Sequence, residues 1–318
     1  MIPMPIDPRT TALVFPGQGS QFVGMGKALA QTEPVAADVF ARADFLLGFP
    51  LSTLCWEGPE QTLNDTVNAQ PALLVHSVAA LRVLQQRFPG FRPACVAGHS
   101  MGEFSALVAA EALGFDQALR LVLERGRAMQ AAGAQRPGGM AAVFGLEVNA
   151  VAEACAQASV EASAVVQVAN DNCPGQVVVS GDLPALDRAL EILTAGGARK
   201  IVRLAVSIGA HSPLMQPAQD RLARAIDAAG ISDPHLPIFG NVEASPLTSA
   251  DAIRRDLQAQ LTSRVRWTES IRAMRAAGVT TFAELGAGNV LCGLIRRIDR
   301  TPATLAIDAP ESFTALVA

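Results

Sequence analysis

The segment that most constrains the fold is residues 96–104, where an apolar run ends in Gly-His-Ser-Met-Gly and a helical pattern begins immediately. Residues 94–97 are typical of the end of a buried strand, and residues 104–113 of an amphipathic helix that ends at Gly114. A strand that turns directly into a helix places the residue between them in a cramped backbone conformation. Here that residue is Ser100.

The glycines of this motif predict that the serine is presented for chemistry. Gly98 and Gly102 leave the space that the crossing of strand and helix requires, so Ser100 Oγ projects from the turn. The N-terminus of the following helix leaves backbone N–H groups unpaired, and that of Met101 points to where an oxyanion would form. These features predict a nucleophile elbow. The alternative is a loop serine that glycines flank by chance.

The composition predicts a compact soluble protein. The 318 residues are 50% hydrophobic and 17% charged, the mean hydropathy is +0.29 and the formal net charge is -4. A chain of this length buries a large core, and it lacks the basic surplus of a general nucleic-acid binder, so we expect no nucleic-acid partner. Five scattered cysteines without a C-x-x-C pair predict reduced, buried thiols and no metal site.

No targeting or membrane segment is expected. Residues 1–9 contain three prolines and lack the basic and then apolar pattern of a secretory signal. The apolar stretches 71–83 and 104–113 are interrupted by His76 and Glu111 and are short for a bilayer span. We therefore expect a cytoplasmic protein that does not bind membranes.

Strand and helix patterns alternate along most of the chain, which predicts an α/β fold with a mostly parallel, hydrolase-like sheet covered on both faces. Between residues 137 and 205 the pattern becomes strand-helix-strand-strand-helix-strand, as in ferredoxin-like units. We therefore expect a large catalytic domain of residues 1–136 and 206–318 with a small α+β subdomain, 137–205, inserted into it. The expected strands are 11–15, 140–144, 165–169, 176–180, 200–204, 234–240 and 280–285. Helices are expected at 71–87, 119–130, 148–157, 183–195, 250–261, 268–277 and 290–298.

A serine hydroxyl needs a base, and four histidines are available. His99 should leave the turn in another direction, His76 lies within a helix, and His235 stands between prolines without a glycine-rich approach. His211 follows a strand and lies downstream of the serine, so elimination predicts it as the base, unless it is a structural loop histidine. No acid is placed to orient it, and a backbone carbonyl can fix the imidazole tautomer instead. A dyad is the expected arrangement.

The loop after strand 11–15 supplies the second candidate for oxyanion binding. Its sequence, Pro-Gly-Gln-Gly-Ser-Gln, places glycines on both sides of Gln18. The lysine and spacing of a phosphate-binding loop are missing, so a nucleotide site is not favoured. Backbone N–H groups of Gln18 and Met101 are therefore the predicted pair of donors, with an ordinary strand-to-helix turn as the alternative for this loop.

Seven motifs in order resemble those of malonyl-CoA:acyl carrier protein transacylases and the acyltransferase domains of fatty acid and polyketide synthases. They are FPGQGSQ at 15–21, QPALL at 70–74, GHSMGE at 98–103, RGRAMQ at 125–130, NCPGQV at 172–177, HSPLM at 211–215 and ELGAG at 284–288. The resemblance covers about residues 11–298. It implies a hydrolase-like α/β domain with a ferredoxin-like insertion.

The resemblance also implies roles for single residues. Ser100 matches the nucleophile, His211 the base, and Gln18 and Met101 the oxyanion-hole amides, while Gln260 matches the residue whose carbonyl orients the histidine. Arg125 matches the arginine that pairs with the free carboxylate of a malonyl group, since a guanidinium forms a two-pronged pair with a carboxylate. Further motif residues are expected at the substrate: His99, Met129, Asn172 and Ala210.

The resemblance implies a ping-pong transfer from malonyl-CoA to the phosphopantetheine thiol of an acyl carrier protein, without a metal or redox cofactor, by an enzyme expected to be a monomer. Carrier proteins of this kind are acidic, so basic residues should steer them, and Arg199, Lys200, Arg296 and Arg297 are the candidates. Malonyl and methylmalonyl remain alternatives, as do fatty acid, polyketide and malonate decarboxylase pathways. The rival functions are a serine hydrolase or editing thioesterase that uses the same dyad, and a docking subunit with an inactive site.

Overall fold

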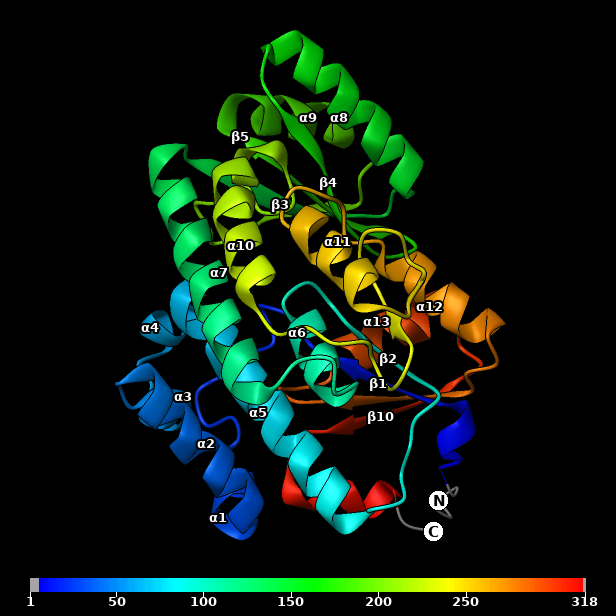
Figure 1. Ribbon diagram of the computed structural model, residues 1–318. Coiled ribbons are helices and arrows are strands. Elements are labelled where there is room, and N and C mark those ends of the chain that lie inside the picture. Colours follow the sequence, from blue (N-terminus) through cyan, green and yellow to red (C-terminus); the bar gives the residue numbers. More distant parts are fainter. Residues whose placement is uncertain (1–5, 317–318) are drawn as a thin grey trace.

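The computed structural model describes residues 6–316, which form a large unit built on sheet A and a smaller unit built on sheet B (Figure 1). Sheet A has six strands in the spatial order β10 (Ala303–Ile307), β9 (Thr281–Leu285), β1 (Thr11–Phe15), β2 (Cys95–Gly98), β7 (Ile238–Phe239) and β8 (Pro246–Leu247). All its pairs are parallel except β7 with β8. This confirms the predicted mostly parallel sheet of an α/β fold.

Helices cover both faces of sheet A because the alternating side chains of its central strand point to two different cores. Leu13 and Phe15 of β1 pack with the helices of one face, whereas Ala12 and Val14 pack with those of the other. The first group includes α1 (Lys27–Thr32), α2 (Pro34–Leu47), α3 (Leu51–Glu57), α4 (Glu60–Asn64), α5 (Thr66–Arg87), α6 (Gly102–Ala109), α7 (Phe115–Gln135), α10 (Gln216–Ala228) and α11 (Ala250–Gln260). The second includes α12 (Trp267–Ala276) and α13 (Val290–Ile298). Short 3-10 helices lie at Pro8–Thr10, Pro213–Met215 and Pro310–Leu316.

Sheet B is antiparallel and has the order β4 (Val166–Cys173), β5 (Gln176–Asp182), β3 (Gly138–Phe144) and β6 (Lys200–Arg203). With α8 (Val148–Ala162) and α9 (Leu183–Ala195) it forms the predicted ferredoxin-like unit. Ala141 and Val143 of β3 pack against these two helices, while Met140 and Ala142 join the core of the large unit. Sheet B therefore has one face covered by its own helices and the other packed on the large unit.

Several boundaries differ from the sequence prediction because packing decides them. Helix α5 begins at Thr66, and Pro71 lies inside it although the prediction placed that residue in the first turn. Helix α7 approaches closely here, since a Cβ on Gly126 would lie 2.9 Å from Val67 Cα. This contact holds residues 66–70 in the helix despite the N–H that proline lacks.

Helix α6 is also shorter than predicted. It ends at Ala109, and Glu111 has a φ of 57°, which turns the chain toward α7 before Gly114. The expected strand at 234–240 reduces to the two residues of β7. Helices α1–α4 and strands β8 and β10 were not predicted. Their apolar periodicity is weak because each is short and depends on tertiary contacts.

By length and composition alone, one helix of the described chain, α5, could cross a membrane. The expectation that its apolar stretch is short for a span is therefore wrong on length, since the helix has 22 residues. In the fold, 83% of its apolar window is buried within the protein. The helix forms part of the core between α2 and α7.

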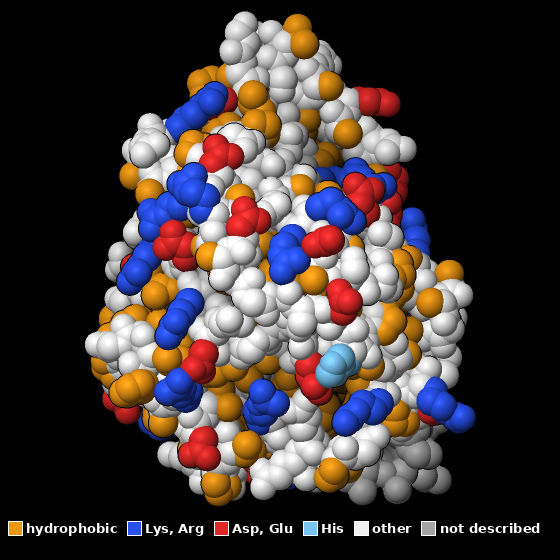
Figure 2. Space-filling model, viewed as in Figure 1, with side chains coloured by type: hydrophobic (Ala, Val, Ile, Leu, Met, Phe, Trp, Pro, Cys, Tyr) orange, Lys and Arg blue, Asp and Glu red, His pale blue; other side chains and the backbone are white. Residues whose placement is uncertain are grey.

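The distribution of surface charges and the state of the cysteines agree with what the composition predicts. Figure 2 shows acidic and basic side chains interspersed on the face that carries α7, α10 and α11. Arg221 of α10 forms an ion pair with Glu124 of α7 on these helices. All five cysteines are free and buried, which confirms the predicted reduced thiols.

A first prediction concerns the glycines beneath Ser100. A Cβ on Gly98 would lie 1.9 Å from the carbonyl carbon of Gly102, which is backbone and cannot move aside. We expect Gly98→Ala to lower the free energy of unfolding by at least about 3 kcal/mol, measured by urea denaturation. Gly293→Ala in α13 is the control, because a Cβ there meets nothing within 4 Å. Equal midpoints for the two variants would contradict this packing.

Candidate active site

Ser100 occupies a strained turn between β2 and α6. Its φ is 51°, in the left-handed region that side chains rarely adopt. The loop after β1 presses against this turn, because a Cβ on Gly17 would lie 2.5 Å from the His99 carbonyl oxygen. On the other side, a Cβ on Gly102 would lie 2.2 Å from the Phe15 carbonyl oxygen. The predicted nucleophile elbow is thus present, at the carboxyl end of the central strands.

His211 lies opposite the serine although 111 residues separate them in the chain. Its Nε2 is 2.8 Å from Ser100 Oγ, and its Nδ1 is 2.9 Å from the carbonyl oxygen of Gln260 and 3.1 Å from that of Ser263. Two carbonyls can only accept, so the proton lies on Nδ1, and Nε2 is left to accept the proton of the serine. This is the dyad arrangement, with a φ of 58° at the histidine as well.

The surroundings keep the histidine neutral. Burial lowers the pKa of His211 to about 3, and the nearby Arg125 guanidinium contributes to this shift. A neutral imidazole is the form that can remove the serine proton. His211 is therefore neutral over the whole physiological pH range.

Arg125 is buried directly beside the nucleophile, with a side chain that is 2% exposed. Its Nη2 donates to Ser100 Oγ at 3.0 Å and to Gln260 Oε1 at 3.0 Å, and its Nη1 donates to Gln70 Oε1 at 2.8 Å. Arg127, two residues along α7, is exposed, as the helical geometry predicted. The close packing of α5 and α7 brings Gln70 to the arginine.

All three acceptors of Arg125 are neutral oxygens. Within the described residues no carboxylate forms a salt bridge with this guanidinium, and its Nε has no partner. Burial lowers the pKa of Arg125 to about 10, so it still carries its charge at neutral pH. A buried cation that has only neutral partners can pair with an anion.

The two predicted oxyanion donors lie on neighbouring loops. Met101 precedes the first residue of α6, and Gln18 lies in the loop that contacts the elbow through Gly17. The Gln18 side chain accepts a hydrogen bond from Thr66 Oγ1 at 3.0 Å, which fixes the loop against α5. Both predicted donors therefore lie on segments that adjoin Ser100.

The remaining substrate candidates surround this centre. His99 Nε2 lies 2.8 Å from Asn172 Oδ1, and the His99 ring meets the edge of Trp267 at 5.5 Å between centroids. Met129 is buried, and its Sδ accepts a hydrogen bond from Gln70 Nε2 at 3.3 Å. Ala210 is buried next to the histidine.

Three of the four basic candidates gather at one end of sheet B. Lys200 and Gln176 both pair with the same residue of β3, and Arg199 adjoins them. Arg297 of α13 donates to Gln176 Oε1. Arg296 instead donates to Thr304 Oγ1 of the edge strand β10 at 2.9 Å. We call Arg199, Lys200 and Arg297 the basic group. Asn172, which contacts His99, lies at the end of β4 next to this basic group.

A cavity of about 430 Å³ adjoins the site. Gln18 and Thr66 line one side of it, and Ser207 and Ile208, which precede His211, line another. Its size lies in the usual range of small-molecule sites. Gln18 and Thr66 connect it through Gln70 to the arginine.

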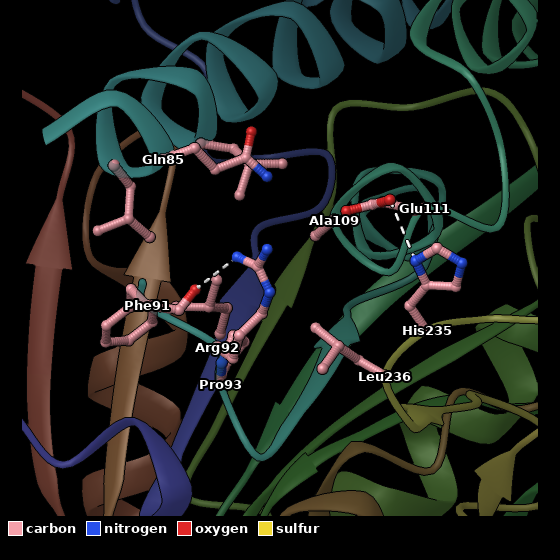
Figure 3. A pocket seen from close by; sticks show the side chains of 11 residues that line it. Gln85, Phe91, Arg92, Pro93, Ala109, Glu111, His235 and Leu236 are labelled. Atoms are coloured by element: carbon pink, nitrogen blue, oxygen red, sulfur yellow. Dashed lines mark hydrogen bonds and ion pairs between the residues drawn. The ribbon is translucent and has the colours of Figure 1, made fainter. Parts of the chain in front are cut away.

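A second cavity of about 200 Å³ lies at the amino ends of β2 and β7, opposite the end of sheet A that carries Ser100. Figure 3 shows Arg92 and Pro93, which precede β2, on one side of it and Leu236 on another. His235 Nδ1 lies 3.1 Å from Glu111 Oε2 at its rim. Since β2 runs from this cavity toward Ser100, the cavity is remote from Ser100 and His211.

Sequence reasoning missed four residues that support the site. Asn241 Oδ1 accepts a hydrogen bond from Ser100 N at 2.8 Å, and Gln70 holds Arg125. Glu103 and Asp256 are buried beneath the elbow. Gln70 and Glu103 stand inside quoted motifs, which was the available signal. Nothing in the sequence marks Asn241 or Asp256.

A sheet that presents a serine on a strained turn to a neutral histidine is found in enzymes that pass acyl groups through a serine ester. The sequence narrows this class: residues 12–302 match the acyl transferase domain family. The malonyl CoA-acyl carrier protein transacylase of Bacillus subtilis is 43% identical over 302 residues, 95% of this chain and 94% of its own. That of Escherichia coli K12 is 43% identical over 304 residues, 96% and 97% of the two chains.

Solved structures of transacylases superpose closely on this chain. A malonyl-transacylase in complex with its type II PKS acyl-carrier protein superposes with a TM-score of 0.93 at 41% identity, over 96% of this chain and 98% of that chain. The transacylase from Xanthomonas oryzae has a TM-score of 0.93 at 43% identity, over 97% and 98%. The chain belongs to the malonyl-CoA:acyl carrier protein transacylase family, as its motifs predicted.

A second prediction tests the neutral histidine. Ser100 should react with a fluorophosphonate probe at a rate that changes less than about threefold between pH 8 and pH 5, because His211, with its pKa near 3, stays neutral throughout. A histidine with the ordinary pKa would be mostly protonated at pH 5 and slow the reaction roughly 30-fold. Intact mass spectrometry measures the rate. An inflection near pH 6.5 would contradict the expected environment of His211.

Proposed function

We propose that this protein transfers a malonyl group from malonyl-CoA to the phosphopantetheine thiol of an acyl carrier protein. Membership of the transacylase family supports the overall reaction. The observation that carries the choice of acyl group is Arg125, a buried guanidinium 3.0 Å from the nucleophilic oxygen with only neutral acceptors around it. The free carboxylate of a malonyl group gives this cation the charged partner that it lacks.

In the proposed first half-reaction, Ser100 Oγ attacks the thioester carbonyl while its proton passes to His211 Nε2. The backbone N–H groups of Gln18 and Met101 stabilise the oxyanion of the tetrahedral intermediate. The carbon–sulfur bond then breaks, and the histidine returns the proton to the CoA sulfur. The product is a malonyl ester on the serine, and the histidine is neutral again.

The second half-reaction reverses these roles. The carrier's thiol gives its proton to His211 Nε2 and its sulfur attacks the ester carbonyl. The bond between the carbonyl carbon and Ser100 Oγ breaks, and the oxygen recovers the proton from the histidine. The cavity beside Gln18 is the proposed path of the phosphopantetheine arm, because its wall residues Gln18 and Thr66 are linked through Gln70 to Arg125. These steps use side chains and backbone amides alone.

Arg125 favours an acyl group that carries a carboxylate and disfavours one that lacks it. Each charge-assisted hydrogen bond to a carboxylate contributes about 1.5–3 kcal/mol. An acetyl group offers no such acceptor, so the buried charge keeps only its neutral partners. A methylmalonyl group carries the same carboxylate, so discrimination against it depends on the room around its extra methyl group.

A third prediction follows from this role. Arg125→Ala should reduce malonylation of Ser100 by at least about 100-fold, because two charge-assisted bonds are lost, while acetylation falls much less. Intact mass after mixing with malonyl-CoA or acetyl-CoA measures both, and Ser100→Ala shows that the adduct is on the serine. Arg127→Ala is the matched control on the exposed side of the same helix. Equal losses for the two acyl donors would show that Arg125 acts on folding rather than on selection.

The same experiment separates the transferase from a hydrolase. A transferase retains the malonyl ester until a carrier thiol arrives, whereas a hydrolase releases free CoA and malonate without an accumulated adduct. Release without an adduct would therefore overturn the proposed transfer. Absence of both adduct and release would overturn the malonyl donor itself.

The basic group at the end of sheet B is the proposed docking site for the carrier. Arg199, Lys200 and Arg297 are exposed around the turn between β4 and β5 and can attract an acidic partner. Arg296 points to β10 and is not included.

A fourth prediction tests this surface. Arg199→Glu and Arg297→Glu should each raise the KM for the carrier by roughly 5-fold at low salt and less at high salt, since exposed charges are screened. Malonylation of Ser100 from malonyl-CoA should stay unchanged. Arg296→Glu is the control, with an equal change in charge one residue away. A carrier KM that rises as much in this control would assign the effect to net charge instead of the surface.

A further inference from the structure

A buried carboxyl group lies directly beneath the nucleophile without an assigned role. Glu103, in the first turn of α6, is 0% exposed. Its Oε2 accepts hydrogen bonds from two side-chain amides, Gln260 Nε2 at 2.9 Å and Asn241 Nδ2. These amides come from distant parts of the chain, 157 and 138 residues away.

The two amides hold the backbone on both sides of Ser100. Asn241 Oδ1 accepts from Ser100 N–H at 2.8 Å, while its Nδ2 also donates to the Gly98 carbonyl at 2.8 Å. Gln260 Nε2 donates to the Ser100 carbonyl oxygen at 3.2 Å. Both peptide units that flank the serine are therefore hydrogen-bonded to amides that converge on Glu103 Oε2, and the Ser100 carbonyl accepts a second hydrogen bond from the Glu103 backbone N–H at 3.1 Å.

One of these peptide units contains the predicted oxyanion donor. The Ser100 carbonyl and the Met101 N–H belong to the same planar trans peptide, so they point in opposite directions. An amide that fixes the carbonyl on the inner side also fixes the direction of the N–H on the side of the reacting carbon. Oxyanion donors act only when they are aimed before the charge develops.

The other oxygen of Glu103 faces a second carboxyl group. Glu103 Oε1 and Asp256 Oδ2 are both buried and have no hydrogen-bond partner within the described residues, and the two carboxyl groups are close enough to influence each other's pKa. One shared proton would satisfy both oxygens. Burial and the nearby Asp256 raise the pKa of Glu103 well above its ordinary value, so Glu103 holds that proton. Asp256 Oδ1 accepts in turn from Val242 N at 3.2 Å.

We propose that protonated Glu103 is a positioning residue for the acyl transfer proposed above, on which this inference rests. Its carboxyl O–H donates a hydrogen bond to Asp256. Its other oxygen accepts hydrogen bonds from Gln260 and Asn241 and so holds these two amides against the peptide units that flank Ser100. Through Gln260 it aims the Met101 N–H at the oxyanion. It contacts neither substrate nor reacting atoms.

The test compares Glu103→Gln with Glu103→Met. Glutamine imitates a protonated glutamate: its oxygen accepts from both amides and its NH₂ donates to Asp256. Methionine has similar length but no such acceptor. We expect single-turnover malonylation of Ser100 to be roughly 10- to 100-fold slower in the methionine variant, at a KM for malonyl-CoA within about threefold of the original protein. The glutamine variant should recover the rate to within about threefold.

Two results would overturn this role. One is a methionine variant with a lower Tm that nonetheless acylates at the original rate per folded molecule, as a merely structural residue would. The other is a glutamine variant as slow as the methionine variant, which would show that the acid must be ionised. If Glu103→Met does not fold, Gln260→Met removes the same donor from the Ser100 carbonyl and should lower kcat. Its lost contact with Arg125 would appear separately, in the ratio of malonylation to acetylation.

The proposed function can be wrong while the positioning role of Glu103 still holds. If the unmodified protein forms no malonyl ester, the malonyl donor is wrong. The same pair of variants is then compared by fluorophosphonate labelling, in which negative charge develops on the probe's phosphoryl oxygen as Ser100 attacks phosphorus and fluoride leaves. A slow methionine variant and a recovered glutamine variant in that assay would support the positioning role, and equal rates would overturn it.

Discussion

The site depends on a crossing of backbone segments so close that only glycine fits. A Cβ on Gly98 would lie 1.9 Å from the Gly102 carbonyl carbon, and one on Gly102 would lie 2.2 Å from the Phe15 carbonyl oxygen. Because β1 and β2 pair in parallel and end at this crossing, Ser100 is forced to a φ of 51°. The surrounding core tolerates this strain and turns it into a fixed position for the nucleophile and for the N-terminus of α6.

The second constraint is one buried positive charge. Arg125 lowers the pKa of His211 further than burial alone would, so the residue proposed to select the acyl group also keeps the base neutral. Carbonyl oxygens of Gln260 and Ser263 suit this arrangement better than a carboxylate would. An aspartate at that place would compete with a substrate carboxylate for the arginine. The dyad and the buried arginine are thus consistent with each other.

Local patterns predicted much of this molecule. Helix α13 and strand β1 have the predicted bounds, because periodicity and flanking glycines mark them, and Ser100 and His211 follow from a motif and from elimination. Pro71 misled the prediction of α5, whose first turn depends on packing against α7. Asn241 and Asp256 could not be found, because a buried polar side chain acquires its partner only when distant segments fold together. Arg296 and Arg297 are adjacent in sequence, and only the structure shows that they point to different strands.

The hydrogen bonds of Ser100 extend the selectivity proposed for Arg125 from binding to rate. Ser100 Oγ donates its proton toward His211 Nε2 and accepts from Arg125 Nη2 at 3.0 Å. A charged donor on the oxygen lone pair makes that oxygen a weaker nucleophile. A carboxylate attracts the guanidinium more strongly than a hydroxyl does, so a malonyl group draws this donor away as it binds. An acyl group without a carboxylate leaves the donor in place. Under the proposed mechanism, binding energy from the carboxylate end of malonyl-CoA would thereby be converted into reactivity at Ser100.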